Sequence, residues 1–251
     1  MIIGSELFHF DELTSTNSHA GMMLRSGSPS EGSVIHTDFQ SAGRGRGENR
    51  WESEKGKNLL FSVILYPESM PASGQFMLSM AISLAICHFL DAIFSGSKIK
   101  WPNDIYYNDD KIAGILIENN IMGNNIESAV AGAGININQL DFPEFPVKAT
   151  SLRILTGREL DLDSCLKRVI NEIDRQYARL LYGDRQEIKE EYLARLYKLN
   201  ERHRFYTGDR SFDGVITGVS EEGLLRIRED NAKVSEFGFR EVGFKRPHSS
   251  L

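Results

Sequence analysis

The stretch "KIKWPNDIYYNDDKIAGILIEN", residues 98–119, decides how the centre of this chain folds. It holds two runs of apolar and β-favouring residues with "YNDD" (107–110) between them. Asn and Asp favour tight turns because their side chains bond to the local backbone, so the pattern predicts a β-hairpin whose second strand begins at Lys111. "ESAVAGAGININ" (127–138) is a further predicted strand, and its two glycines allow another segment to approach closely.

Three more strands are predicted upstream of this hairpin, with a short helix between the first two. The strands are the apolar runs "LFHFDEL" (7–13), "GSVIHTDFQ" (32–40) and "NLLFSVILYP" (58–67). "TSTNSHA" (14–20) is typical of a turn, and "MMLRSG" (22–27) indicates a short helix that ends at Gly27.

The most apolar segment is "FMLSMAISLAICHFLDAIF" (76–94), which is close to the length of a membrane span. His88 and Asp91 interrupt it, and no basic flank sets an orientation. We therefore predict a buried core helix rather than a membrane span.

The periodicity becomes helical after residue 160. Seven apolar or aromatic residues between 162 and 181 recur at helical spacing, and Asp161 or Asp163 is well placed as the N-cap. A second, strongly charged helix is predicted over "RQEIKEEYLARLYKL" (185–199).

The chain beyond Asn200 changes to short strands with tight turns. The strands are expected in "HRFYTGD" (203–209), "FDGVITGVSEEGLLRI" (212–227) and "NAKVSEFGF" (231–239), a pattern typical of a small β-barrel or sandwich. The sequence therefore predicts a mixed α/β domain over residues 1–199 and a β domain over residues 200–251.

The composition excludes several classes of protein. The chain has 251 residues, 41% of them hydrophobic, which is enough for a real core. Its net charge of −6 argues against a general nucleic-acid-binding protein, which would usually be basic. Cys87 and Cys165 are too few for a disulfide framework or a zinc site. No signal peptide is recognisable in residues 1–17, so we expect free thiols and a cytoplasmic protein.

The loop "GRGRGENRW" (43–51) concentrates three glycines and three arginines ahead of a predicted strand. Glycines let backbone N–H groups approach an anion, and arginine offers forked donors to a carboxylate or phosphate. The spacing is neither that of a P-loop nor G-x-G-x-x-G, so the loop alone indicates only anion binding.

Three other motifs have ordinary structural interpretations when each is taken alone. "KWPND" (100–104) is typical of a turn, "GAGININ" (132–138) of a buried strand, and "STN" (15–17) of a helix N-cap. Lys111 would lie at the mouth of the predicted hairpin beside Gly114, where it could neutralise a carboxylate or phosphate.

Together and in this order, "STN", "QSAGRGRG" with the tryptophan after it, "KWPND", "KIAGILIE" and "GAGIN" resemble the biotin protein ligase family, the biotin–[acetyl-CoA-carboxylase] ligases. The resemblance extends from about residue 8 to about residue 245. It implies an α+β fold in which a mixed sheet is flanked by helices, as in class II aminoacyl-tRNA synthetases and lipoate ligases. "FDGVITGVSEEGLLRI" looks like that family's small C-terminal SH3-like β-barrel.

The resemblance also implies an activity. An ATP-dependent ligase of this kind converts biotin to biotinyl-5′-AMP and then transfers biotin to a lysine of a biotin carboxyl carrier domain. ATP and Mg²⁺ are the expected co-substrate and counter-ion, biotin is the substrate, and no tightly bound prosthetic group is expected. We expect a monomer or a homodimer, with strand 127–138 available to pair across a two-fold axis, and no nucleic-acid or membrane partner.

The family's functional residues carry over to matching positions in this sequence. The catalytic cations are expected to be Arg44, Arg46 and Lys111. The biotin site is expected to comprise Ser15, Thr16, Asn17, Gln40, Gly43, Arg44, Lys111 and Gly114. The nucleotide site is expected to comprise Arg46, Trp51, Asn103, Asp104, Lys111 and Asn136. Asp104 would either hold Mg²⁺ or orient the acceptor lysine, and Arg240 or Lys245 could contact ATP or the carrier.

The glycine-rich cationic loop is expected to close over the anionic adenylate and shield it from water. This chain departs from the family there, because "GEN" (47–49) stands where a second glycine–arginine pair is usual. Glu48 adds a negative charge, which leaves open how tightly the adenylate is retained. "STN" begins at residue 15, without room for the N-terminal winged helix of some relatives, so we expect no DNA binding.

Three alternative functions would each use some of these features. A lipoate or octanoate ligase shares the fold, but its usual R-R-x-x-G-G-G-like loop is missing here. A non-catalytic biotin or nucleotide sensor would not need Arg44, Arg46 and Lys111 together. A nucleic-acid-binding module conflicts with the acidic balance.

Overall fold

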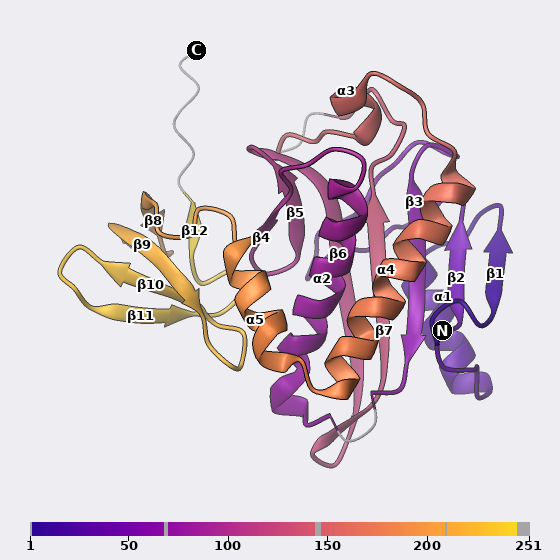
Figure 1. The fold of residues 1–251 in the computed structure, drawn as a ribbon, viewed down its shortest axis with the longest axis horizontal. Coiled ribbons are helices and arrows are strands. Elements are labelled where there is room, and N and C mark those ends of the chain that lie inside the picture. The colour runs from indigo at the N-terminus through magenta and orange to yellow at the C-terminus, as the bar shows by residue number, and fades with distance from the viewer. Residues whose placement is uncertain (1, 68–69, 144–146, 209, 245–251) are drawn as a thin grey trace.

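A seven-stranded mixed sheet with helices on both faces forms the larger part of the protein, as Figure 1 shows. The computed structural model describes residues 2–67, 70–143, 147–208 and 210–244. The strand order is β1-β2-β3-β7-β6-β5-β4; β1 and β2 are parallel, and the other neighbouring pairs are antiparallel. The strands are β1 (Leu7–Phe10), β2 (Val34–Thr37), β3 (Leu59–Leu65), β4 (Lys98–Lys100), β5 (Asp104–Tyr107), β6 (Asp110–Met122) and β7 (Asn125–Ile135). The predicted mixed sheet is therefore confirmed.

The hairpin predicted from residues 98–119 is present, but its first arm is two strands. Residues 101–103 form a turn between β4 and β5, and Pro102 has no N–H to donate to a ladder. The second arm, β6, begins one residue before Lys111 and pairs with β5 on one side and β7 on the other. β6 and β7 together carry the floor of the cavity described below.

The centre of the sheet is apolar on both faces. All seven residues of β3 are buried, with Val63 in the larger core cluster and Ile64 in a smaller one under α1 (Thr16–Ser26). A strand covered on both sides has no solvent face, which explains why "LLFSVIL" is continuously apolar rather than alternating.

The helix α2 (Gln75–Asp91) lies in the core, as predicted. The helical segment Ala72–Asp91, which includes α2, is long and apolar enough to cross a membrane by length and composition, yet 12 of the 17 residues of α2 are buried in the protein. α2 packs against α4 (Leu162–Tyr182) and α5 (Arg185–Ala194) on the face of the sheet opposite α1 (Figure 1). A short 3-10 helix, η1 (Ala72–Gly74), precedes it, and α3 (Leu152–Thr156) precedes α4.

Two predicted helix boundaries were wrong. The helix expected from Met22 begins at Thr16, so residues 16–20 of "TSTNSHA" are helical. Ser15 is the N-cap and accepts from the Ser18 N–H, which confirms the N-cap interpretation of "STN". The helix expected to reach residue 199 ends at Ala194, because the following backbone bonds to the edge of β4. Asp161 is the N-cap of α4.

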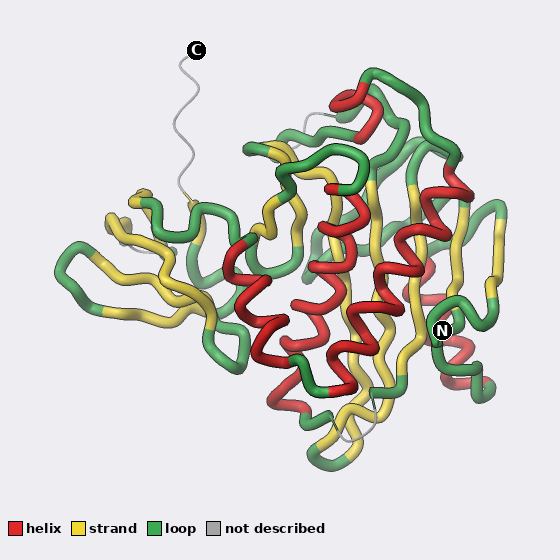
Figure 2. The backbone as a smooth tube through the Cα atoms, in the orientation of Figure 1, coloured by secondary structure: helices red, strands yellow, loops and turns green. Residues whose placement is uncertain are grey.

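The C-terminal residues form a five-stranded antiparallel sheet, which is the small β domain expected from the sequence. Its order is β11-β10-β9-β8-β12, and Figure 2 shows its strands and loops beside α5. The strands are β8 (Arg202–Tyr206), β9 (Ser211–Val219), β10 (Leu225–Glu229), β11 (Val234–Phe237) and β12 (Gly243–Phe244). Buried residues such as Phe205 and Ile227 belong to the same core cluster as α2, so the two parts share one apolar interior. The exact division at residues 199 and 200 stays a prediction.

The strand considered for pairing across a two-fold axis lies inside the sheet. β7 is hydrogen-bonded to β3 along one side and to β6 along the other. Its backbone ladder from Ala129 to Ile135 is therefore occupied within one chain rather than free to pair across a two-fold axis.

Candidate active site

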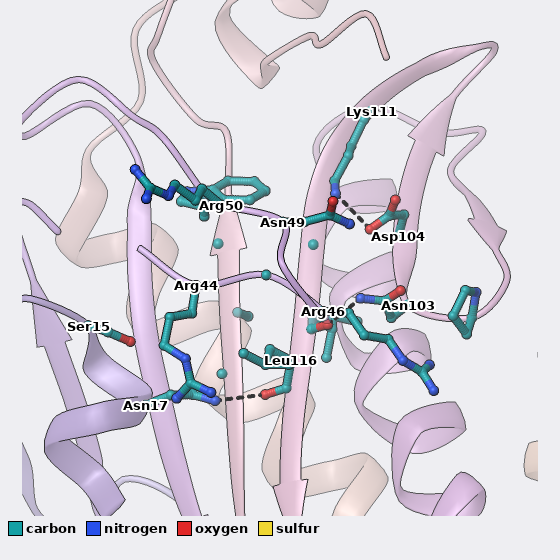
Figure 3. A pocket seen from close by; sticks show the side chains of 18 of the residues that line it. Ser15, Asn17, Arg44, Arg46, Asn49, Arg50, Asn103, Asp104, Lys111 and Leu116 are labelled. Carbon is teal, nitrogen blue, oxygen red and sulfur yellow. Dashed lines mark hydrogen bonds and ion pairs between the residues drawn. The ribbon is translucent and has the colours of Figure 1, made fainter. Parts of the chain in front are cut away.

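A cavity of about 190 Å³ opens above the central strands, and Figure 3 shows the side chains around it. Eleven of the thirteen residues predicted for the site line it: Ser15, Thr16, Asn17, Gln40, Arg44, Arg46, Trp51, Asn103, Asp104, Lys111 and Gly114. Gly43 and Asn136 do not line it. The α1 N-terminus, the Gly/Arg loop and the β5–β6 hairpin thus meet at one place, although they are distant in sequence.

Neutral polar side chains line one end of the cavity, and the Arg44–Glu118 ion pair lies beside them. The N–H of Thr16 donates to Gln40 Oε1 over 2.8 Å, and Ser62 Oγ lies 2.6 Å from Asn17 Oδ1. Asn17 also donates to the carbonyl of Leu116 over 3.1 Å. These bonds fix the side chains, because each buried polar group would be costly to leave without a partner.

Gly132 on β7 leaves the space that Asn17 occupies. A Cβ added at Gly132 would lie 1.9 Å from Asn17 Oδ1. The close approach that the two glycines of this strand allow is therefore used by the polar end of the cavity.

The guanidinium of Arg44 is held by a carboxylate that the sequence analysis missed. Its two terminal nitrogens lie 2.6 and 3.1 Å from the Glu118 oxygens, and Asn17 donates to the same carboxylate over 2.9 Å. A bidentate pair of this kind fixes the arginine plane. Glu118 belongs to "KIAGILIE", but only the fold brings it to Arg44.

Lys111 and Asp104 form an ion pair across β5 and β6. The Lys111 ammonium lies 2.7 Å from Asp104 Oδ1, with about a quarter of each side chain exposed. Asn103 next to it donates to the Ile115 carbonyl over 2.6 Å. Figure 3 shows Lys111, Asp104 and Asn103 on the same side of the cavity.

Asn136 stabilises the backbone at the start of β6, next to Lys111. Its N–H donates to Ile112 O over 2.9 Å, and its side-chain amide donates to Thr150 O over 3.0 Å. Thr150 N donates in turn to Lys111 O. Asn136 therefore touches the backbone that carries Lys111 rather than the cavity itself.

The indole of Trp51 covers the floor of the cavity. Cβ atoms added at Gly114 and Gly134 would lie 3.1 Å and 2.4 Å from its ring, so these glycines make a flat seat for it. Lys111 Nζ lies 5.6 Å from the ring centroid. Trp51 Nε1 is buried and has no hydrogen-bond partner among the described residues, so its N–H would become available to an acceptor only when the indole moves.

Gly43 closes the base of the Gly/Arg loop. Its carbonyl accepts from the Trp51 N–H over 3.0 Å, and a Cβ there would lie 2.3 Å from Trp51 O. Arg44 and Arg50 form an isolated antiparallel bridge, so the loop is a small hairpin.

The C-terminal domain reaches the cavity through the turn at residues 238–241. The Arg46 guanidinium stacks 4.3 Å from the ring centroid of Phe239, which also lines the cavity, and burial lowers the Arg46 pKa. Arg240 lies against Gly47 of the loop. Phe239 was not predicted, because no local pattern indicates that this turn meets the loop. Lys245 lies outside the described residues.

The cavity is locally cationic in an acidic protein. Five lysines and arginines line it, namely Arg44, Arg46, Arg50, Lys100 and Lys111, whereas Asp104 is the single carboxylate among its described lining residues. Beside neutral polar side chains and a glycine floor, this charge suits an elongated substrate that is neutral at one end and anionic at the other.

Comparisons with known proteins agree with this arrangement. The family model for the biotin/lipoate A/B protein ligase family matches residues 8–136. The bifunctional ligase/repressor BirA of Bacillus subtilis is 30% identical over 230 residues, covering 90% of this chain and 70% of the relative. The biotin–[acetyl-CoA-carboxylase] ligase of Paracoccus denitrificans is 30% identical over 196 residues, covering 75% of this chain and 81% of the relative.

A solved structure extends the likeness to the whole fold. Biotin protein ligase from Aquifex aeolicus, solved in complex with biotin and ATP, matches with a TM-score of 0.80 and 26% identity. The match covers 97% of this chain and 100% of that chain, including the C-terminal sheet described above. The chain therefore belongs to the biotin/lipoate A/B protein ligase family.

Proposed function

We propose that this protein is an ATP-dependent biotin protein ligase, which forms biotinyl-5′-AMP and transfers biotin to a lysine of a biotin carboxyl carrier domain. The observation that carries the proposal is the meeting of Arg44, Arg46 and Lys111 around one cavity beside neutral polar side chains. Relatives named as biotin ligases, and one solved with biotin and ATP, support the same function.

Biotin's neutral ureido ring matches the polar end of the cavity. Asn17, Thr16 and Gln40 offer amide and hydroxyl groups there, and an unpaired buried group would cost about 1–3 kcal/mol. The apolar ring and valeryl chain would lie along the glycine floor at Gly114 and Gly134, which the Trp51 indole covers until it moves. The carboxylate would then point toward Lys111, and Arg44 would reach it only by leaving Glu118, which holds its guanidinium beside Asn17.

In the first step, a biotin carboxylate oxygen attacks the α-phosphorus of ATP. The bond from that phosphorus to the bridging oxygen breaks, and pyrophosphate leaves with the electron pair. Two anions must come together, and two unit charges 4 Å apart repel by about 4 kcal/mol at a surface-like dielectric. Lys111, held by Asp104 before the substrates bind, would reduce that repulsion, and Arg46 would add its charge when the 43–51 hairpin closes.

In the second step, the neutral amine of the carrier lysine attacks the carbonyl carbon of the anhydride. The bond to the AMP oxygen breaks, AMP leaves, and the new amide loses a proton. Asp104 is the carboxylate placed to orient that amine, since it lines the cavity beside Lys111.

Mg²⁺ would enter with the triphosphate rather than occupy a protein cage. Asp104 is the one carboxylate among the described lining residues, and Mg²⁺ commonly uses one or two carboxylates together with phosphate oxygens. Asp104 fits as one such ligand, with Asn103 and Asn49 as neutral oxygen donors nearby. When bound, the ion would neutralise phosphate charge.

The cavity must enlarge to hold both substrates. Its volume of about 190 Å³ is below the roughly 300–1,000 Å³ of ligand pockets. Trp51 lies on the floor, so moving its indole and the 43–51 hairpin would make room, and the hairpin could then close over the adenylate. Trp51 would face the adenine or the closed loop.

Biotin-dependent exchange of labelled pyrophosphate into ATP tests the proposal, because the exchange requires reversible adenylate formation without any carrier. We expect exchange with biotin and little with lipoate. Exchange with lipoate alone would favour the lipoate or octanoate ligase, and biotin binding without exchange would favour a sensor.

A further inference from the structure

The two strands at the edge of the sheet carry the same tripeptide pattern in register. "HFD" (9–11) ends one residue beyond β1 and "HTD" (36–38) ends one residue beyond β2, and the parallel pairing sets His9 opposite His36. The ladder continues, since Asp38 N donates to Phe10 O. Side chains alternate along a strand, so both histidines lie on one face, while Phe10 packs on the other beside α1. Asp11 and Asp38 directly follow the strands, and their carboxylates lie close to His9.

This register gathers donor atoms that lie far from the cavity. The imidazole rings of His9 and His36 stack with centroids 4.8 Å apart, and His9 Nε2 lies 3.1 Å from Asp38 Oδ1. One ligand atom from each of His9, Asp11 and Asp38 lies within 4.8 Å of the others. None of these residues lines the active-site cavity.

The donor set selects a class of ion. Imidazole nitrogen with carboxylate oxygen suits Zn²⁺, Co²⁺, Ni²⁺ and similar ions, whereas Mg²⁺ and Ca²⁺ prefer oxygen alone. The His9 and Asp38 side chains are 49% and 44% exposed, so an ion could enter and keep water as its remaining ligands. His36, stacked on His9, would fix the orientation of the ligating ring.

We propose that His9, Asp11 and Asp38 bind one divalent transition-metal ion, with His36 as the positioning residue. The ion would join the edge strand β1 to β2. The residues that follow β1 are also hydrogen-bonded to those that follow β2. Leu13 N donates to Phe39 O over 3.0 Å, and Thr16 N donates to Gln40 Oε1 over 2.8 Å. The site would therefore stabilise the two segments that supply the polar end of the cavity.

Calorimetric titration of the chelator-treated full chain with Zn²⁺ tests this proposal. We expect one Zn²⁺ per chain, undisturbed by millimolar Mg²⁺, and a higher melting temperature with Zn²⁺. His9→Ala and Asp38→Asn should each weaken binding by at least about tenfold, since even outer-shell changes at metal sites cost about that much. His36→Phe, which keeps the stacking, should weaken it less than His36→Ala.

His203→Ala is the matched control. His203 Nε2 also lies 3.0 Å from a carboxylate oxygen, that of Glu201, but His203 belongs to no group of three possible metal ligands among the described residues. This variant should bind Zn²⁺ like the wild type. Substoichiometric binding in the wild type, or equal affinity in His9→Ala and the wild type, would overturn the proposal. Circular dichroism of each variant separates loss of the site from loss of the fold.

Discussion

The ammonium of Lys111 and the carboxylate of Asp104 lie 2.7 Å apart on neighbouring strands of the central hairpin. A register shift between Ile105 and Tyr106 in β5 lies between the two. Because the pair lines the cavity, an anionic substrate would compete with Asp104 for Lys111. The positive charge is thus held in position before the substrates arrive, which is the condition for electrostatic catalysis.

Lys111→Ala should abolish most adenylate formation. Removing one positioned charge donor from an active site typically lowers kcat by about 10²–10³-fold. Lys111→Arg should retain part of the activity, because the positive charge is kept but the compact ammonium is replaced by a larger, planar guanidinium. Biotin-dependent pyrophosphate exchange measures the effect; activity within threefold of wild type in Lys111→Ala would remove this lysine from the mechanism.

Asp104→Asn separates the two roles open to this carboxylate. If Asp104 orients the acceptor amine, pyrophosphate exchange should persist while transfer from preformed biotinyl-5′-AMP to the carrier slows. If it helps to hold Mg²⁺, exchange should fall and recover partly at higher Mg²⁺ concentration. Single-turnover assays of each half-reaction distinguish these results. If the variant matched the wild-type rate in both half-reactions, Asp104 would have neither role.

Gly134→Ala should displace Trp51 from the cavity floor. The added Cβ would lie 2.4 Å from the indole, which is closer than such contacts allow. We expect a change in tryptophan fluorescence and a raised KM for biotin. Gly208→Ala is the control, because a Cβ at Gly208 meets nothing within 4 Å. A variant with wild-type fluorescence and KM would show that Trp51 is not seated on this glycine.

Phe239→Ala should raise the KM for ATP more than the KM for biotin. Phe239 stacks on Arg46, and a partly desolvated cation–π contact contributes about 1–2 kcal/mol. Phe239→Trp should restore the stacking and the KM, which a general loss of stability would not allow. Tyr206→Ala, at an aromatic residue 48% exposed on β8, should leave both constants unchanged. Equal increases in both KM values would instead point to a nonspecific loss of domain packing.

Asp91 should stabilise the fold in a pH-dependent way. Burial raises its pKa, but hydrogen bonds from Arg195 and from Ser97 outweigh burial and leave the Asp91 pKa below its ordinary value. A depressed folded-state pKa gives stability above the unfolded pKa of about 3.9, and that stability is lost as the pH falls through the folded value. Asp91→Asn should therefore lower the free energy of unfolding at pH 7, with a smaller difference below pH 4, in urea titrations. A pH-independent difference would contradict this cause.

The sequence predicted the elements that have strong local patterns. The "YNDD" turn, the continuous apolar run of β3 and the helical spacing before Leu181 each depend on neighbouring residues, and each was found. The turn predicted over residues 14–20 was wrong, whereas the N-cap interpretation of "STN" was confirmed. Ser, Thr and Asn favour both turns and N-caps, and only tertiary packing selects between them.

The site residues that were predicted also lie in local motifs, and those that were missed depend on long-range contacts. Residues inside recognisable motifs, such as Lys111 and Asn17, line the cavity as expected. Glu118 and Phe239 were missed, because their roles depend on long-range contacts with the Gly/Arg loop. Asn136 lies in a recognised motif yet contacts backbone behind Lys111, since a motif marks proximity to a site without fixing which way a side chain points.

The most direct test of the central claim is the mass of the acceptor. The purified protein is mixed with ATP, Mg²⁺, biotin and a biotin carboxyl carrier domain, with lipoate in a parallel reaction, and the carrier is weighed by mass spectrometry. We predict an increase of one biotin on one lysine of the carrier, lost in Lys111→Ala, and no change with lipoate. An unmodified carrier in the biotin reaction, or modification by lipoate alone, would contradict the assignment of this protein as a biotin protein ligase.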